Sequence, residues 1–304
     1  MERVWGGREL ERVYGRQLPE QGTPYGESWE IVDRAEAQSV VDHGPLAGKT
    51  LHELWTRHRD EIFGTGHAES ERFPILLKIL DARDDLSIQV HPPADLAASL
   101  GGEPKTEMWV IAGCEPGARL YIGLKKGVGR AAFERAIRDG SVADSVHSIT
   151  PQPGQSIFIP SGRLHAIGAG ILIHEIQQNS DTTYRVFDWN RLGLDGKPRT
   201  LHVEPSLASI DFDDIVPGMD EPQGPLLAEC PYFKTERLHI APGETVAVAD
   251  PERFAILSML EGSLRDGDGR NYKPGQSILL PRHGIPPAAE ASTTLLRVTL
   301  PQCV

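Results

Sequence analysis

Residues 153–165 read PGQSIFIPSGRLH, and this stretch decides the fold of the chain. A Pro-Gly turn precedes a short apolar strand, and Pro160 and Gly162 follow it, which is typical of antiparallel β structure. The first five letters recur at 274–278, and Pro281 follows that copy at the same offset as Pro160 follows the first. Two copies of one strand–turn unit predict two related β-barrel modules.

Glycine and proline interrupt the rest of the chain often, since its 31 Gly and 24 Pro exceed average usage. A Pro- and Asp-rich stretch at 211–224 is expected to be a linker between an N-terminal domain, 1–210, and a C-terminal domain, 225–304. The expected strands are 73–80, 86–91, 107–112, 118–122, 156–160, 171–176, 183–187, 232–240, 254–260, 277–280 and 294–299.

Few helices are expected, and all are short. Thr50 and Glu53 form a capping box that begins one, and Gly64 ends it. The other two are 131–139, closed by a glycine, and Ala94–Leu100. The chain is therefore expected to be mainly β.

Composition excludes several classes of protein. The formal net charge of −12 disfavours a nucleic-acid surface and an anionic-membrane binder. The three cysteines, Cys114, Cys230 and Cys303, lie far apart without a CxxC pair, which favours a reduced, cytoplasmic protein. No apolar run is long enough for a membrane span, and no apolar signal core is expected at the N-terminus. The oligomeric state stays open.

One group of polar residues carries the chemistry. Gln89 and His91 are two apart in an expected strand, so their side chains share a face while the apolar neighbours point the other way. Glu107 begins the next long strand, and His165 ends the stretch quoted above. An amide, two imidazoles and a carboxylate suit Zn²⁺ or another borderline divalent metal, with one position left for water or substrate.

The quoted stretch resembles the second signature of the cupin superfamily. Gly154, Pro160, Gly162 and His165 follow one another at the cupin spacing, and Ala169 stands where that signature has Asn. The resemblance implies two cupin-type, jelly-roll-like β-barrel modules with a few short helices. The first would be the catalytic domain with helical insertions.

The second copy resembles a cupin barrel without metal ligands. It keeps Gly275 and Pro281, but His283 and Pro286 stand where Gly and His are expected. Only the N-terminal module then carries a site, so one zinc ion per chain is implied.

Seven stretches, at 5–7, 26–29, 73–78, 89–92, 105–109, 160–166 and 177–186, carry a closer resemblance. In these stretches, which lie in family order, the chain resembles the short bacterial type I mannose-6-phosphate isomerases (phosphomannose isomerases). The resemblance implies that Gln89, His91, Glu107 and His165 are zinc ligands and that Arg185 is the catalytic arginine.

The implied reaction interconverts mannose 6-phosphate and fructose 6-phosphate by moving a proton between C1 and C2 through an enediol. Such a site needs a base, a polarised carbonyl and charge stabilisation. Arg185 would stabilise the negative charge. Glu175 is the preferred base, with Lys105 and a metal-bound water as rivals.

Three residues are expected to bind the substrate phosphate: Lys78 inside an apolar run, Ser87 on the face of Gln89, and Arg191. Asp181 is a candidate anchor for Arg185. Alternatives also stay open: a carbohydrate-binding cupin without catalysis, an isomerase of a related sugar phosphate, or an iron oxygenase, which the Gln ligand disfavours.

Overall fold

The computed structural model describes residues 1–301, so Cys303 lies outside the described part, and Cys114 and Cys230 are free thiols. The chain is mainly β, as predicted, with 35% strand and 14% helix. It divides into two compact units. The first comprises Met1–Ser28 and Lys78–Asp220, and the second comprises Trp29–Leu77 and the residues from Glu221 onward.

The first unit holds the strands that position the site. Its helices are α1 (Glu9–Tyr14), α4 (Ala94–Ala97), α5 (Arg130–Asp139), α6 (Val142–Ser145) and α7 (Val203–Ser209). Its strands are β1 (Glu2–Gly7), β6 (Ile88–Val90), β7 (Glu107–Cys114), β8 (Leu120–Leu124), β9 (Val146–Ile149), β10 (Ser156–Ile159), β11 (His165–Ile167), β12 (Ile171–Gln178) and β13 (Tyr184–Phe187). The strands β2 (Glu27–Ile31) and β5 (Ile75–Ala82) begin in one unit and end in the other.

Two antiparallel sheets form the barrel of this unit. One runs in the order β1-β5-β12-β7-β10, and the other in the order β13-β6-β11-β8-β9. Alternate side chains of both sheets meet in one apolar cluster, in which Trp109 and Ile173 of the first sheet join Leu120 and Ile167 of the second.

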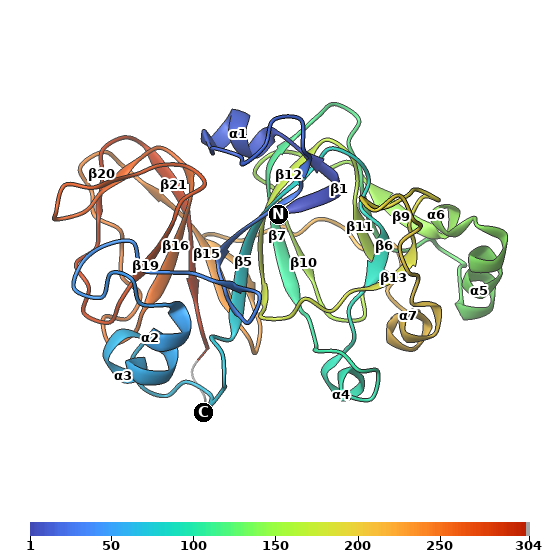
Figure 1. The fold of residues 1–304 in the computed structure, drawn as a ribbon, viewed down its shortest axis with the longest axis horizontal. Helices are drawn as coiled ribbons and strands as arrows, with labels where there is room; N and C mark the ends of the chain where they lie inside the picture. The colour runs from blue at the N-terminus through green and yellow to red at the C-terminus, as the bar shows by residue number, and fades with distance from the viewer. Residues whose placement is uncertain (302–304) are drawn as a thin grey trace. The chain divides into compact units, whose positions relative to one another are not determined.

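Helices cover the outer side of the second sheet. Figure 1 shows α5, α6 and α7 beside β9 and β13. Ile88 and Val90 of β6 pack in this outer cluster with Phe133 and Leu207 from the helices. Gln89 between them therefore faces the barrel interior, as the alternation predicts.

The second unit has its own sheet, in the order β14-β15-β21-β16-β19. Its elements are β3 (Asp33–Arg34), β4 (Ala37–Gln38), α2 (Leu51–Arg57), α3 (Arg59–Ile62), β14 (Leu226–Glu229), β15 (Lys234–Ile240), β16 (Ala255–Glu261), β17 (Leu264–Arg265), β18 (Asn271–Tyr272), β19 (Ser277–Leu280), β20 (Ala288–Ala289) and β21 (Thr293–Thr299).

Residues 29–77 differ from the sequence expectation, which places them within the N-terminal domain of 1–210. They pack with the C-terminal residues, because Phe63 and Phe73 both lie edge-on to Phe254, with ring centroids 5.0 and 5.8 Å from it. The predicted capping box of Thr50 is present and begins α2, but the helix breaks at His58 into α2 and α3.

No helix within residues 1–301 is long and apolar enough to cross a membrane.

Candidate metal centre and active-site cavity

Three of the four predicted ligands meet inside the first barrel. His91 follows β6, Glu107 begins β7, and His165 begins β11. Their potential ligand atoms all lie within 4.8 Å of one another, and each residue is buried. Nε2 of His91 and Nε2 of His165 are each 3.5 Å from an oxygen of Glu107. Among the described residues this is the only such group of His, Cys, Asp and Glu.

Hydrogen bonds orient both imidazoles for metal binding. Nδ1 of His91 pairs with the carbonyl of Thr182 at 2.8 Å, and Nδ1 of His165 pairs with the carbonyl of Arg163 at 2.9 Å. A proton held on Nδ1 leaves Nε2 as the lone-pair donor, which is how metal-binding histidines are arranged. Nε2 of His91 is buried without a hydrogen-bond partner.

Burial keeps both imidazoles neutral. It is the main cause that lowers the pKa of His91 to about 3, with the Lys105 charge as a second cause. Burial also lowers the pKa of His165. Glu107 is held ionised, since the neighbouring Lys105 and His91 outweigh burial and bring the pKa of its carboxyl well below the usual range. Neutral imidazoles and an ionised carboxylate are the forms that bind a divalent metal, so these residues fit the predicted ion.

Gln89 lies beside the three ligands. Its amide nitrogen is 3.3 Å from Nε2 of His165, and the Ser87 hydroxyl donates to its amide oxygen at 3.2 Å. β6 and β11 pair at this point, with Gln89 opposite His165. The turn before His165 is also fixed to the site, because the amide of Gly162 donates to the carbonyl of His91 at 2.9 Å. Gly162 has a φ of 93°, which favours glycine.

Lys105 links the metal group to the predicted base. Its ammonium lies 2.9 Å from Glu107 and 3.2 Å from Glu175, and all three side chains are buried. The two carboxylates raise the pKa of Lys105 against the effect of burial. Burial and the charge of Glu107 raise the pKa of Glu175. The carboxyl of Glu175 therefore takes up a proton more readily than an exposed one, as a proton carrier must.

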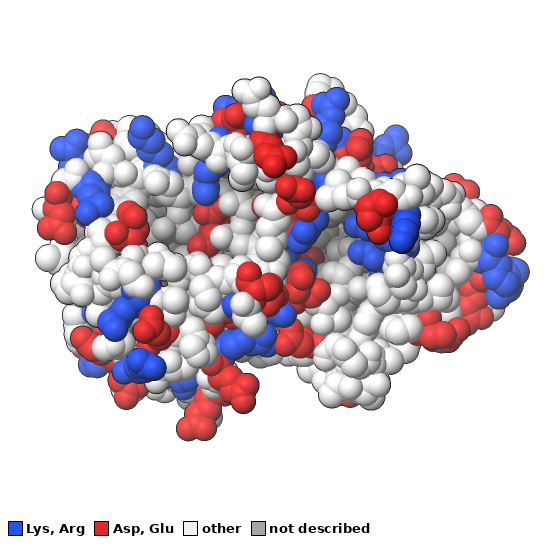
Figure 2. Space-filling view, in the orientation of Figure 1, with Lys and Arg blue, Asp and Glu red and all other residues white. Residues whose placement is uncertain are grey.

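These residues line an open cavity of about 590 Å³. Figure 2 shows the first unit hollowed, with basic and acidic side chains beside the hollow. The predicted residues on its wall are Lys78, Ser87, Gln89, Lys105, Glu107, His165, Glu175 and Arg185. The volume suits a small polar ligand such as a sugar phosphate.

Arg185 reaches the cavity from β13. Its Nη1 donates to the carbonyl of Thr200 at 2.9 Å, and its Nε is buried without a hydrogen-bond partner. The expected anchor, Asp181, lies instead 3.7 Å from the ammonium of Lys78, which is equally far from Glu27. The buried Lys78 thus has acidic neighbours on two sides.

Arg191 does not line the cavity, and Arg199 does. Both guanidinium groups donate to the buried carboxylate of Asp188, whose pKa they lower against burial. Sequence reasoning missed Arg199 because it lies in an irregular segment after β13, where no strand period assigns a face. Arg3 and Glu27 of the cavity wall, joined by an ion pair of 2.8 Å, were missed as well.

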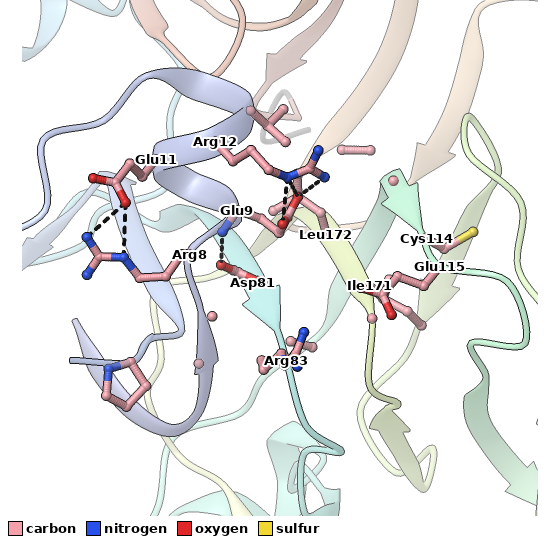
Figure 3. Close-up of a pocket in the computed structure, with 18 of the residues that line it drawn as sticks. Arg8, Glu9, Glu11, Arg12, Asp81, Arg83, Cys114, Glu115, Ile171 and Leu172 are labelled. Carbon is pink, nitrogen blue, oxygen red and sulfur yellow. Dashed lines mark hydrogen bonds and ion pairs between the residues drawn. The ribbon is translucent and has the colours of Figure 1, made fainter. Parts of the chain in front are cut away.

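A larger cavity, of about 790 Å³, lies elsewhere on the same unit, beside α1 and the ends of β5 and β12 (Figure 3). Asp81 accepts the amide of Glu9 there at 2.6 Å, and Arg12 pairs with Glu9. Asp81 alternates with Leu80, a wall residue of the first cavity, so this hollow lies on the outer face of the sheet. None of the predicted site residues lines it.

Comparisons with known proteins find relatives over nearly the whole chain. The family "Phosphomannose isomerase type I, catalytic domain" matches residues 1–108. Mannose-6-phosphate isomerase ManA of Bacillus subtilis is 36% identical over 92% of this chain and 90% of its own length. The crystal structure of the mannose 6-phosphate isomerase from Bacillus subtilis superimposes with a TM-score of 0.85 and 32% identity, over 99% of this chain and 97% of that one.

A more distant structure has the same fold and carries metal. It is a mannose 6-phosphate isomerase bound with zinc and yttrium, with a TM-score of 0.72 and 18% identity, over 99% of this chain and 97% of that one.

Proposed function

Because the chain belongs to the type I phosphomannose isomerase family, we propose that it interconverts mannose 6-phosphate and fructose 6-phosphate in the 590 Å³ cavity of the first unit. The observation that carries the proposal is the buried meeting of His91, Glu107 and His165 beside Lys105 and Glu175. A binding protein has no need of a proton carrier next to a metal group, whereas an aldose–ketose isomerase needs a proton carrier and a group that polarises the carbonyl, which a metal can supply.

We propose zinc as the metal, one ion per chain, held by Gln89, His91, Glu107 and His165. The free Nε2 of His91 and the ionised Glu107 support this assignment. A bound zinc ion would supply Lewis-acid polarisation and orientation of the sugar oxygens. The backbone carbonyls on the two Nδ1 atoms would hold the imidazoles in place throughout turnover.

The proton transfer falls to Glu175 in this proposal. Its carboxylate takes the proton from C2 of open-chain mannose 6-phosphate and returns it to C1 of the enediol, while O1 gains a proton and the C2 hydroxyl loses one, so that the carbonyl moves from C1 to C2. The reverse reaction uses the same group. Lys105, 3.2 Å away, stabilises the carboxylate of Glu175 when it is charged. When the carboxyl is neutral, Lys105 donates a hydrogen bond to a sugar oxygen. The raised pKa of Lys105 keeps it protonated, so it is less suited than Glu175 to act as the base.

Arg185 stabilises the charge that develops on the enediolate oxygen. Its Nε is desolvated and unpartnered, so it has a hydrogen bond to give to the substrate. A donor already present in a water-poor site needs little reorganisation as the charge develops.

We place the phosphate on the side of the cavity where Arg199 lies. Ser87 and Lys78 also line the cavity. Arg191 acts indirectly, because it shares the carboxylate of Asp188 with Arg199. The group of Arg191, Arg199 and Asp188 therefore keeps a net positive charge. Such a cluster suits a phosphate dianion.

The C-terminal domain, 225–304, is proposed to have no part in the chemistry. The part of it that the structure describes holds no group of His, Cys, Asp and Glu close enough to bind a metal.

A coupled assay tests the proposal. The purified protein, loaded with zinc, is given mannose 6-phosphate in one series and free mannose in another, and the ketose formed is measured. Turnover of the phosphate ester well above that of mannose supports the proposed function. Turnover of neither sugar, with mannose 6-phosphate still binding, would assign the cavity to a carbohydrate-binding protein.

A further inference from the structure

His202 holds the peptide of Arg185 from the open edge of the second sheet. β13 is the last strand of that sheet and pairs only with β6. The backbone amide of Arg185 donates to Nδ1 of His202 at 3.2 Å, and the amide of His202 donates to the carbonyl of Arg185 at 2.7 Å. Both backbone polar groups of Arg185 are thus satisfied by a single residue outside the strand.

The segment that carries His202 also holds the Arg185 side chain. The carbonyl of Thr200, two residues earlier, accepts from Nη1 of Arg185 at 2.9 Å. The guanidinium is therefore fixed at one nitrogen and leaves Nε without a partner at the cavity. Residues 200–202 therefore hold both the backbone and the side chain of Arg185 by hydrogen bonds.

The imidazole of His202 has no other hydrogen-bonding task in the described contacts. It stands at the N-cap position of α7, yet its side chain makes no cap hydrogen bond to that helix. Its ring lies beside that of Tyr184, with ring centroids 6.0 Å apart. Burial and the charge of Arg185 lower the pKa of His202, so the ring stays neutral and Nδ1 can accept.

We propose that His202 is a positioning residue for the isomerase: its Nδ1 accepts the amide of Arg185 and so sets where the guanidinium stands in the cavity. This inference rests on the proposed function and on the catalytic part given there to Arg185. A displacement of about 1 Å at a catalytic group can cost about 100-fold in rate, so loss of this acceptor affects turnover more than binding.

Two variants separate the acceptor from the ring. His202→Phe keeps a flat ring against Tyr184 and removes the acceptor. His202→Asn removes the ring and keeps an oxygen close to where Nδ1 stands. We expect kcat for mannose 6-phosphate to fall about tenfold or more in His202→Phe with KM within about threefold of the wild type. We expect His202→Asn to recover most of that loss.

A double variant tests whether His202 acts through Arg185. Combining His202→Phe with Arg185→Ala should give no further loss beyond Arg185→Ala alone, because there is no guanidinium left to place. His147→Phe, a half-buried histidine of β9 away from the cavity, is the matched control and should keep full activity. Zinc content and melting temperature are measured for every variant.

Unchanged kcat in His202→Phe, equal losses in the Phe and Asn variants, or a further loss in the Arg185→Ala background would each overturn the positioning role. Failure of the proposed function looks different, since the wild-type protein would then not convert mannose 6-phosphate at all.

Discussion

Replacing Lys105 by Met tests how the centre of the site is held together. Lys105 is the only described cation in ion-pair distance of both Glu107 and Glu175, and the three side chains are 6%, 1% and 3% exposed. Removing one member of a buried ion pair costs about 3–5 kcal/mol, because the other member keeps its charge away from water. The pKa of Glu175 is raised, so its carboxyl is already close to neutral. Removing Lys105 therefore leaves one buried carboxylate charge, that of Glu107, without its lysine partner.

Protonation sets an upper limit to this cost. A carboxyl with a reference pKa of about 4.3 can take a proton at pH 7 for about 3.7 kcal/mol. We therefore expect Lys105→Met to lower the free energy of unfolding by about 3–4 kcal/mol at pH 7. At pH 5 the same protonation costs about 1 kcal/mol, so the deficit should shrink to about that value.

The direction of this pH dependence follows from the carboxyl that has lost its lysine partner. Its pKa in the folded variant lies above its unfolded value, so the folded state binds the extra proton and gains stability as the pH falls toward the unfolded pKa. Urea unfolding of chelator-treated wild type and variant, followed by tryptophan fluorescence at pH 7 and pH 5, measures both deficits. Lys126→Met, at an exposed lysine after β8, is the control and should change stability by less than about 0.5 kcal/mol. A deficit below about 1 kcal/mol at pH 7, or one that stays constant down to pH 5, would refute the reasoning.

Four further outcomes are expected. His91→Ala and His165→Ala should each lose most of the bound zinc as measured by atomic absorption, and full zinc content in either would remove that residue from the ligand set. Arg185→Ala should fold and bind zinc while kcat falls about 100-fold or more, so an unchanged rate would contradict its role. Chelation should abolish turnover and added Zn²⁺ should restore it, whereas activity indifferent to the chelator would speak for a metal-free site. Burial raises the pKa of Asp81 to about 6, so the charged carboxylate destabilises the folded state above pH 6 and this cost disappears as the pH falls from 6 toward 4. Asp81→Asn should therefore stabilise the protein by about 1–2 kcal/mol at pH 8, allowing for partial screening, and by close to nothing at pH 4. The exposed control Asp84→Asn should leave stability unchanged at both pH values.

The sequence predicted those parts of the site that follow a strand period. Gln89 and His91 flank an apolar residue, and the alternation placed them inside the barrel, where the structure has them. His165 follows a turn in which Pro160 restricts the backbone and Gly162 adopts a positive φ that other residues avoid, and β11 begins there. Strand period and turn residues act over a few neighbours, so one sequence is enough to interpret them.

The parts that failed depend on contacts between distant segments. Arg199 reaches the cavity because Asp188 holds it, eleven residues away along an irregular stretch. Residues 29–77 join the second unit, where aromatic rings from two distant stretches of the chain pack together. Neither contact leaves a periodic signal. The cytoplasmic location, by contrast, stays a prediction.

The charge of the cavity can now be located more closely than the sequence allowed. The sequence suggested a small basic pocket inside an acidic protein, but two of its cations are compensated: Lys105 by two glutamates, and Lys78 by Glu27 and Asp181. Arg191 and Arg199 share the single carboxylate of Asp188, so that cluster keeps one net positive charge. Arg185 differs, since its guanidinium is held by a carbonyl and makes no ion pair with an acid among residues 1–301. A neutral carbonyl fixes the position of a cation without cancelling its charge. Arg185 therefore keeps its whole charge for an anionic oxygen of the substrate, and its position is set by the Thr200 carbonyl and by His202, with no carboxylate involved.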